Sequence, residues 1–148
     1  MKYSSALLGG LAGATALTIL HETVRKVNED APRMDLLGKE AITKSLKCVH
    51  VAIPNEDNLF KINMACDIIS NSLYYSFAGV CDEKQSVLTG ALLGVTAGIG
   101  AVALPKPMGL DDAPSNRTTQ TKLMTIGWYT FGGLIAGITC KLLHNPPK

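Results

Sequence analysis

The chain has 148 residues, the size of a single domain, and 47% of them are apolar while only 18% are charged. This composition excludes a disordered chain. The net charge of +2 is too small, and the Lys and Arg residues are too scattered, to indicate nucleic-acid binding. The four cysteines show no CxxC pairing, so we predict no zinc site, no disulfide framework, no other metal site and no cofactor.

Charged residues avoid three long windows, at 3–20, 86–104 and 123–140. Each window is close to the roughly 20 residues that cross about 30 Å of hydrocarbon as a helix. We therefore predict an all-α protein, a four-helix transmembrane bundle that forms one membrane domain over 1–148, with helices at about 4–21, 62–81, 86–104 and 123–143. A soluble α-helical domain with a Gly- and Ala-rich core is the alternative.

The first helix, 4–21, carries small residues at four-residue steps, among them Gly9 and Gly13. Such rows let helix backbones approach closely in a bilayer. Lys2 followed by an apolar run is also a feature of secretory signal peptides. Because the apolar run continues past the small residues to Leu20, we expect a permanent helix instead.

The first long connection holds a basic amphipathic segment at about 35–51, in which apolar residues alternate with Lys39, Lys44 and Lys47. This pattern predicts an interfacial helix that lies at the membrane surface. An ordinary solvated helix packed on the connection fits the same residues.

Polar residues follow one face of the segment 62–81. Asn63, Asp67, Asn71 and Tyr74 are separated by helical three- and four-residue steps. In a bilayer this face must turn towards the other helices, where a buried carboxylate such as Asp67 is a candidate functional group. The four residues are our candidates for the lining of a transport path. A helix half-submerged at the interface, or a purely structural Asp67, explains the same pattern.

The window at 86–104 has the clearest packing signal, with Gly90, Gly94 and Gly98 at four-residue spacing. The last helix repeats this spacing with Gly133 and Gly137. Together with the glycines of the first helix, they predict glycine-zipper faces. Three helices with such faces offer more close-packing surface than one compact monomer obviously needs, which favours a homo-oligomer or a larger membrane complex.

Two parts of the sequence resemble each other. GGLAGATA at 9–16 aligns with GALLGVTA at 90–97, and EDAP at 29–32 aligns with DDAP at 111–114. The shared order indicates two parallel two-helix repeats, related by an axis along the membrane normal. Chance alignment of Gly- and Ala-rich sequence is the alternative.

Four crossings place both chain ends on one side of the membrane. That side carries four of the 14 Lys and Arg residues, and the side with the two long connections carries the other ten. The excess of positive charge predicts cytoplasmic connections and both termini outside. At the start of the last helix, Arg117 and Lys122 are candidate contacts for the phosphate of an anionic lipid, with ordinary helix capping as the alternative.

The phrases EDAPRMDLLG and ALPKPMGLDDAPSNRTTQTK, about a fifth of the chain, resemble segments of small, uncharacterised multi-pass membrane proteins of bacteria. The resemblance implies a bacterial inner (cytoplasmic) membrane. It carries over no activity and no catalytic residue.

No GxSxG turn and no HExxH helix organises the Ser, His and Asp residues into a catalytic site, so we do not expect an enzyme. We expect a small integral membrane protein with a structural or accessory role, which packs through its small-residue faces into a homo-oligomer or a larger complex in the lipid bilayer. The alternative is a minimal transporter or channel, in which the polar face of 62–81 lines the path and Asp67 binds a cation or a proton.

Overall fold

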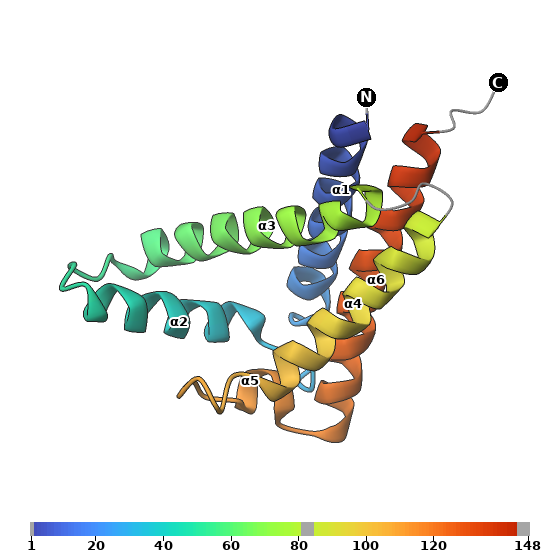
Figure 1. The fold of residues 1–148 in the computed structure, drawn as a ribbon. Helices are drawn as coiled ribbons and strands as arrows, with labels where there is room; N and C mark the ends of the chain where they lie inside the picture. The colour runs from blue at the N-terminus through green and yellow to red at the C-terminus, as the bar shows by residue number, and fades with distance from the viewer. Residues whose placement is uncertain (1, 81–84, 145–148) are drawn as a thin grey trace.

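The computed structural model of the protein describes residues 2–80 and 85–144. Within these ranges every regular element is an α-helix, which confirms the all-α prediction (Figure 1). The second predicted helix was expected to end at Cys81, and that end lies outside the described residues. The helices are α1 (Lys2–Val24), α2 (Met34–Cys48), α3 (Glu56–Val80), α4 (Ser86–Ala103), α5 (Ala113–Asn116) and α6 (Thr119–His144).

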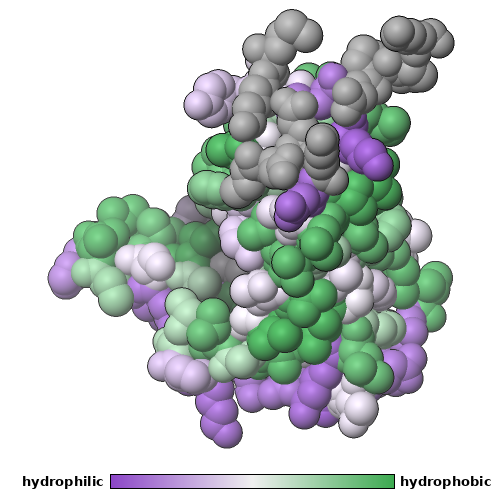
Figure 2. Space-filling model, turned by 45° about the vertical axis from the view of Figure 1, so that its right-hand side comes forward, coloured by the Kyte–Doolittle hydropathy of each residue, from purple (hydrophilic) through white to green (hydrophobic). Residues whose placement is uncertain are grey.

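Three of these helices are long and apolar enough to cross a membrane: Tyr3–Val24 in α1, Ser86–Ala103 in α4 and Thr119–His144 in α6. The fourth predicted crossing, in α3, is not among them. Figure 2 shows apolar side chains across the middle of the molecule, and hydrophilic ones along its lower end and again towards its upper end. Length and composition therefore support a membrane protein with three candidate spans.

Helix α6 packs antiparallel against α4 through glycines. Gly90 lies against Gly133, and Gly98 lies against Ile126, so the residue number rises on one helix as it falls on the other. A Cβ atom on Gly98 would lie 2.6 Å from the Cα of Ile126, closer than real Cβ atoms approach. The two backbones are therefore in direct contact, as the four-residue spacing predicts for paired membrane helices.

Helix α6 also packs antiparallel against α1. Gly13 lies against Ala136, and Cys140 Sγ is 3.7 Å from the carbonyl oxygen of Ser5. The start of α1 and the end of α6 consequently lie at the same end of the molecule (Figure 1). The glycines singled out in the sequence are all buried between helices of this one chain: Gly9, Gly13, Gly90, Gly94, Gly98, Gly133 and Gly137.

Helix α3 has two parts. Its second half packs antiparallel against α1, from Thr18 beside Asp67 at one end to Ala6 beside Gly79 at the other. Its first half extends away from α1 together with α2, and the two form an arm at the side of the molecule (Figure 1). We call α2 together with residues 56–62 the α2–α3 arm.

The two acidic-Ala-Pro segments meet at the end of the molecule opposite the start of α1. The backbone N–H of Arg33 donates to the carbonyl oxygen of Pro114 over 2.8 Å, and the hydroxyl of Thr121 donates to the carbonyl oxygen of Asp30 over 2.9 Å. Ala31 is buried at this contact. The connection between α1 and α2 is thus tied to the connection that leads into α6.

The proposed repeat finds no support in the helix contacts. An internal repeat would place Gly9 against α3, in the way that Gly90 lies against α6. Gly9 instead faces Ala136 and Cys140 of α6, and it is Gly10 that faces α3. Glycines that are aligned in the sequence therefore have non-equivalent neighbours in the fold.

Two helices begin earlier than the apolar pattern indicates. Helix α3 begins at Glu56, because Asn55 accepts the backbone N–H of Asn58 at 2.9 Å and so caps a turn with acidic residues. Helix α6 begins at Thr119, where Thr118 Oγ1 accepts the backbone N–H of Thr121 at 3.0 Å. Capping chemistry, which hydropathy does not register, sets both starts.

The buried core lies where α1, α3 and α6 meet, around Leu17, Tyr75, Tyr129 and Ala136. Tyr75 is fully buried, and its hydroxyl donates to the carbonyl oxygen of Tyr129 over 2.8 Å. This hydrogen bond satisfies the one polar atom of a large buried side chain. The core fixes the second half of α3 next to α6, and it thereby positions the polar side chains of α3, such as Asp67, that are described in the next subsection.

Candidate functional site

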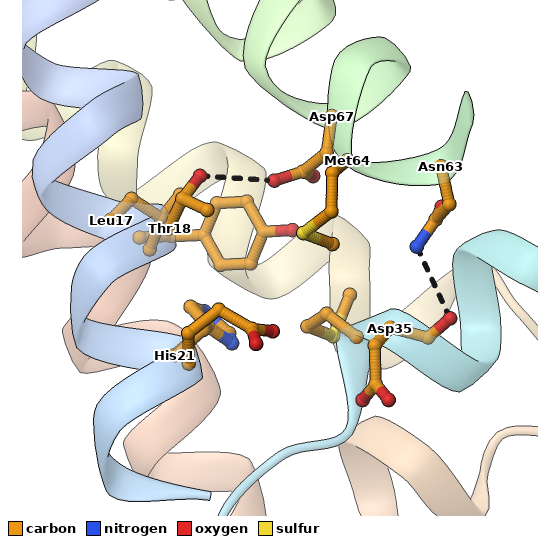
Figure 3. A pocket seen from close by; sticks show the side chains of 10 residues that line it. Leu17, Thr18, His21, Asp35, Asn63, Met64 and Asp67 are labelled. Atoms are coloured by element: carbon orange, nitrogen blue, oxygen red, sulfur yellow. Dashed lines mark hydrogen bonds between the residues drawn. The ribbon is translucent and has the colours of Figure 1, made fainter. Parts of the chain in front are cut away.

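A small cavity of about 20 Å³ lies at the junction of α1, α2, α3 and α6 (Figure 3). We call it the polar cavity, because six of its ten lining residues carry polar or charged side chains although it lies beside the apolar core. Its size matches the space that a single water molecule needs. It is lined by Leu17, Thr18, His21, Glu22, Met34, Asp35, Asn63, Met64, Asp67 and Tyr129.

Asp67 reaches the polar cavity from α3. One of its carboxylate oxygens accepts a hydrogen bond from the side-chain amide of Asn71 at 2.9 Å. The other faces the hydroxyl of Thr18 on α1 at 3.4 Å (Figure 3). Both of these donors are neutral. Within the described residues, no Lys, Arg or His lies in ion-pair contact with this carboxylate.

His21 faces the same cavity from α1. Its side chain is packed edge-on against Trp128, with ring centroids 4.9 Å apart, and against Tyr129 at 5.9 Å. Only 8% of the residue is exposed. Neither ring nitrogen has a hydrogen-bond partner in the part of the chain that the structure describes. Buried polar atoms without a partner are rare in folded proteins, so the two nitrogens are the unusual feature of this cavity.

An ionic network borders the polar cavity on the side of the connection between α1 and α2. Asp35 of α2 accepts hydrogen bonds from Arg33 at 2.8 Å and 2.9 Å, and Arg25 bridges Asp35 and Glu22. Burial alone would raise the pKa of Asp35, but the hydrogen bonds from Arg33 and the positive charges of Arg33 and Arg25 hold that pKa below its usual value. The network therefore keeps Asp35 ionised at neutral pH.

The four polar residues predicted to line a path do not all point to one place. Asn63 donates to the carbonyl oxygen of Asp35 on α2 at 3.2 Å, and the hydroxyl of Tyr74 donates to the carbonyl oxygen of Leu93 on α4 at 3.1 Å. Only Asn63 and Asp67 line the polar cavity. The polar face of α3 thus divides its contacts among α1, α2 and α4.

Two wider hollows adjoin the polar cavity. One of about 320 Å³ lies between α2 and α3 and is lined by Cys66 and Asp67 among others. The other, of about 600 Å³, lies between α3 and α4, with Tyr74 and Ala101 in its wall. Met34 lines all three spaces. The polar cavity also shares Asn63 and Asp67 with the first hollow, and Tyr129 with the second.

The candidate lipid-contact residues lie at the start of α6. Arg117 is exposed, and its guanidinium donates to the carbonyl oxygen of Glu29, while Lys122 is exposed nearby. Thr118 faces the carboxylate of Asp30 at 3.3 Å. A carboxylate of the chain itself therefore lies at this helix terminus, for which a lipid phosphate and ordinary helix capping were the two alternatives.

Among the described residues, no three His, Cys, Asp or Glu side chains are close enough to hold a metal ion. Sequence reasoning missed the role of His21 at the polar cavity, because its position after the apolar run suggests a headgroup contact. The available signal was its spacing: His21 falls one helical turn after Leu17, on the face that also carries Ala14.

No family model matches the chain, and no curated protein and no solved structure matches it. We therefore infer function from the residues and contacts described above.

Proposed function

We propose that the protein is a small integral membrane protein whose long helices form a four-span bundle and whose role is structural or accessory. The observation that carries this proposal is the burial of every predicted packing glycine between helices of the same chain, beside three apolar helices of membrane-crossing length. Close backbone packing of this kind stabilises helices in lipid, where the hydrophobic effect does not drive their association.

The contacts of α3 support a fourth crossing. Helices α1 and α4 both run antiparallel to α6, so α1 and α4 run in the same direction. If α1 and α4 both cross the bilayer, the chain must return in the segment between them. Of the two helices in that segment, α2 and α3, it is α3 that runs alongside α1 in the reverse direction, from Asp67 to Gly79. Its polar residues are turned towards other helices, which lowers the cost of the crossing.

We place the protein in a bacterial inner membrane with both termini outside and both long connections in the cytoplasm. The excess of Lys and Arg in the connections supports this orientation, and the resemblance to bacterial multi-pass proteins supports the membrane. The α2–α3 arm then lies near the cytoplasmic interface. On it, Leu36 and Ile62 are exposed apolar residues and Lys47 is an exposed cation, as in interfacial helices.

An accessory role requires a partner protein in the membrane. Because the packing glycines are buried within one chain, a homo-oligomer or a larger complex has to form through the outward-facing residues instead. Leu7 and Leu11 on α1 and Leu88 and Leu92 on α4 are such residues, each about half exposed. They are suited to contact either lipid or another membrane helix.

Extraction and crosslinking test this proposal in native membranes. The protein should stay in the pellet after a carbonate wash, whereas release into the supernatant would show a soluble or peripheral protein. Crosslinking followed by a pull-down should capture the chain with a second copy or with another membrane protein. Capture of the monomer alone, at every crosslinker length, would remove the accessory role.

A second candidate function is a minimal transporter or channel, favoured by the absence of a basic ion-pair partner for Asp67 within the described residues. An intramembrane carboxylate without such a partner is a preferred site for a cation or a proton. Purified protein in proteoliposomes should then conduct protons, and Asp67→Asn should abolish the flux. Equal flux in the wild type and in Asp67→Asn would exclude this function, and Asp57→Asn on exposed α3 surface provides the matched control.

A further inference from the structure

The polar cavity combines two unusual groups. His21 is 8% exposed and has two ring nitrogens without partners in the described chain, and Asp67 has only neutral hydrogen-bond donors. Both side chains line the same space of about 20 Å³ (Figure 3). His21 is a base with an available lone pair, and Asp67 is an acid. The space between them therefore suits a species that both donates and accepts hydrogen bonds.

The other charged groups around His21 are already engaged. Glu22 on α1 pairs with Arg25 at 2.6 Å, and Asp35 on α2 pairs with Arg33 at 2.8 Å. Tyr129 faces the imidazole from α6 through its ring. Asp67 on α3 is therefore the one carboxylate at the cavity that lacks a positive partner among the described residues.

We propose that the polar cavity binds one water molecule, through which His21 and Asp67 share one exchangeable proton. In one state the imidazolium N–H donates to the water, and the water donates to the Asp67 carboxylate. In the other state the proton has moved through the water to Asp67, which leaves a neutral imidazole and a carboxylic acid. The summed charge of the pair is zero in both states, which suits a site beside an apolar core.

The site requires the folded bundle but requires neither transport nor a partner protein. It therefore goes beyond both functions proposed above, and a negative flux or crosslinking result would leave it standing. A third proton state, with His21 protonated and Asp67 also protonated, adds one positive charge at acid pH. An experiment can follow this titration through the protonation of His21.

The chain carries its own reporter of that titration. Trp128 is the only tryptophan in the sequence, and its ring lies edge-on to His21 at 4.9 Å. A protonated imidazole in contact with an indole quenches its fluorescence, because it accepts an electron from the excited state. The emission of Trp128 should therefore follow the protonation of His21.

The experiment measures Trp128 emission of the 148-residue protein in lipid nanodiscs from about pH 3 to about pH 8.5, a range that includes the ordinary pKa of histidine and values that burial lowers. We expect a sigmoidal loss of emission at low pH in the wild type and none in His21→Gln. Asp67→Asn should move the midpoint to lower pH by about one unit, because it removes the negative charge that favours the imidazolium. His50→Gln, at an exposed histidine, should change nothing.

If the pH midpoint of Trp128 emission in Asp67→Asn equals that of the wild type, the shared proton is ruled out. A wild-type loss of emission in His21→Gln would rule it out as well. If Asp67→Asn does not fold, Thr18→Val serves instead, since it removes a donor to Asp67 and keeps the carboxylate. An unchanged midpoint in Thr18→Val then has the same meaning. Solid-state NMR tests the water directly: a cross-peak between water protons and the His21 ring nitrogens is expected, and its absence in folded protein would overturn the bridge.

Discussion

The sharpest test of the packing concerns two glycines on α6. Gly133 is in backbone contact with α4: an added Cβ would overlap the carbonyl oxygen of Gly90 and lie 2.9 Å from the nitrogen of Gly94. Gly127 is on the same helix, and nothing lies within 4 Å of the corresponding Cβ position. The substitutions Gly133→Ala and Gly127→Ala thus add the same methyl group to the same helix in opposite surroundings.

The magnitudes follow from these surroundings. At Gly133 the obstructing atoms belong to backbone, so α4 and α6 must move apart, and overpacking of this kind costs about 1–3 kcal/mol. At Gly127 the methyl group meets no atom within 4 Å. The higher helix propensity of alanine stabilises both variants alike, by up to about 1 kcal/mol. The difference between them is therefore the overpacking cost, and we expect Gly133→Ala to be less stable than Gly127→Ala by about 1–3 kcal/mol.

Reversible unfolding in mixed micelles, followed by the loss of helical circular dichroism with increasing SDS, measures this difference. The wild-type curve should lie between those of the two variants. Equal midpoints for Gly133→Ala and Gly127→Ala would refute the backbone contact between α4 and α6. Gly90→Ala, whose Cβ would overlap Gly133, should reproduce the Gly133→Ala result from the other helix.

Further predictions concern the connection end, the orientation and the core. The pKa of Asp35 is lowered in the folded protein, so its ion pairs stabilise the fold at any pH above the unfolded-state pKa of about 3.9. That stabilisation is lost as the pH falls through the folded-state pKa. The free energy of unfolding, measured from neutral to acid pH, should therefore fall less steeply in Asp35→Asn than in the wild type. A variant with Cys48 as its only cysteine should react with an impermeant maleimide only after right-side-out vesicles are opened, and reaction in intact vesicles would reverse the proposed orientation. Tyr75→Phe should cost about 1 kcal/mol in the same SDS assay, because the hydroxyl bonded to Tyr129 is lost, and an unchanged midpoint would contradict that bond.

The sequence allowed the long helices to be located, because segregation of charge and apolar length are properties of single segments. Which helices pack against each other is harder to predict, since it depends on which of several small residues faces which helix. Gly9 and Gly10 are adjacent and chemically identical, yet one contacts α6 and the other α3. Nothing in the local pattern distinguishes them, which is why an apparent repeat in the sequence did not predict the contacts.

The candidate site was predicted in part for a similar reason. The helical spacing of polar residues indicated that Asp67 faces other helices, and its carboxylate does reach α1. The partner across the cavity, His21, comes from a segment far away in the sequence, and its own neighbours in the chain suggest the headgroup region. Only the crossing of α1 and α3 brings the two together, and that crossing depends on packing around Tyr75 rather than on any motif.

The position of α6 between α1 and α4 has a consequence for biosynthesis. Both α1 and α4 place glycines against α6, which is synthesised after both of them. Until α6 enters the membrane, Gly13 and Gly94 face lipid or a provisional neighbour, so the fold cannot close during synthesis of the first 118 residues. A chain truncated before Thr119 should therefore insert its early helices but remain sensitive to membrane quality-control proteases, whereas the 148-residue chain should resist them.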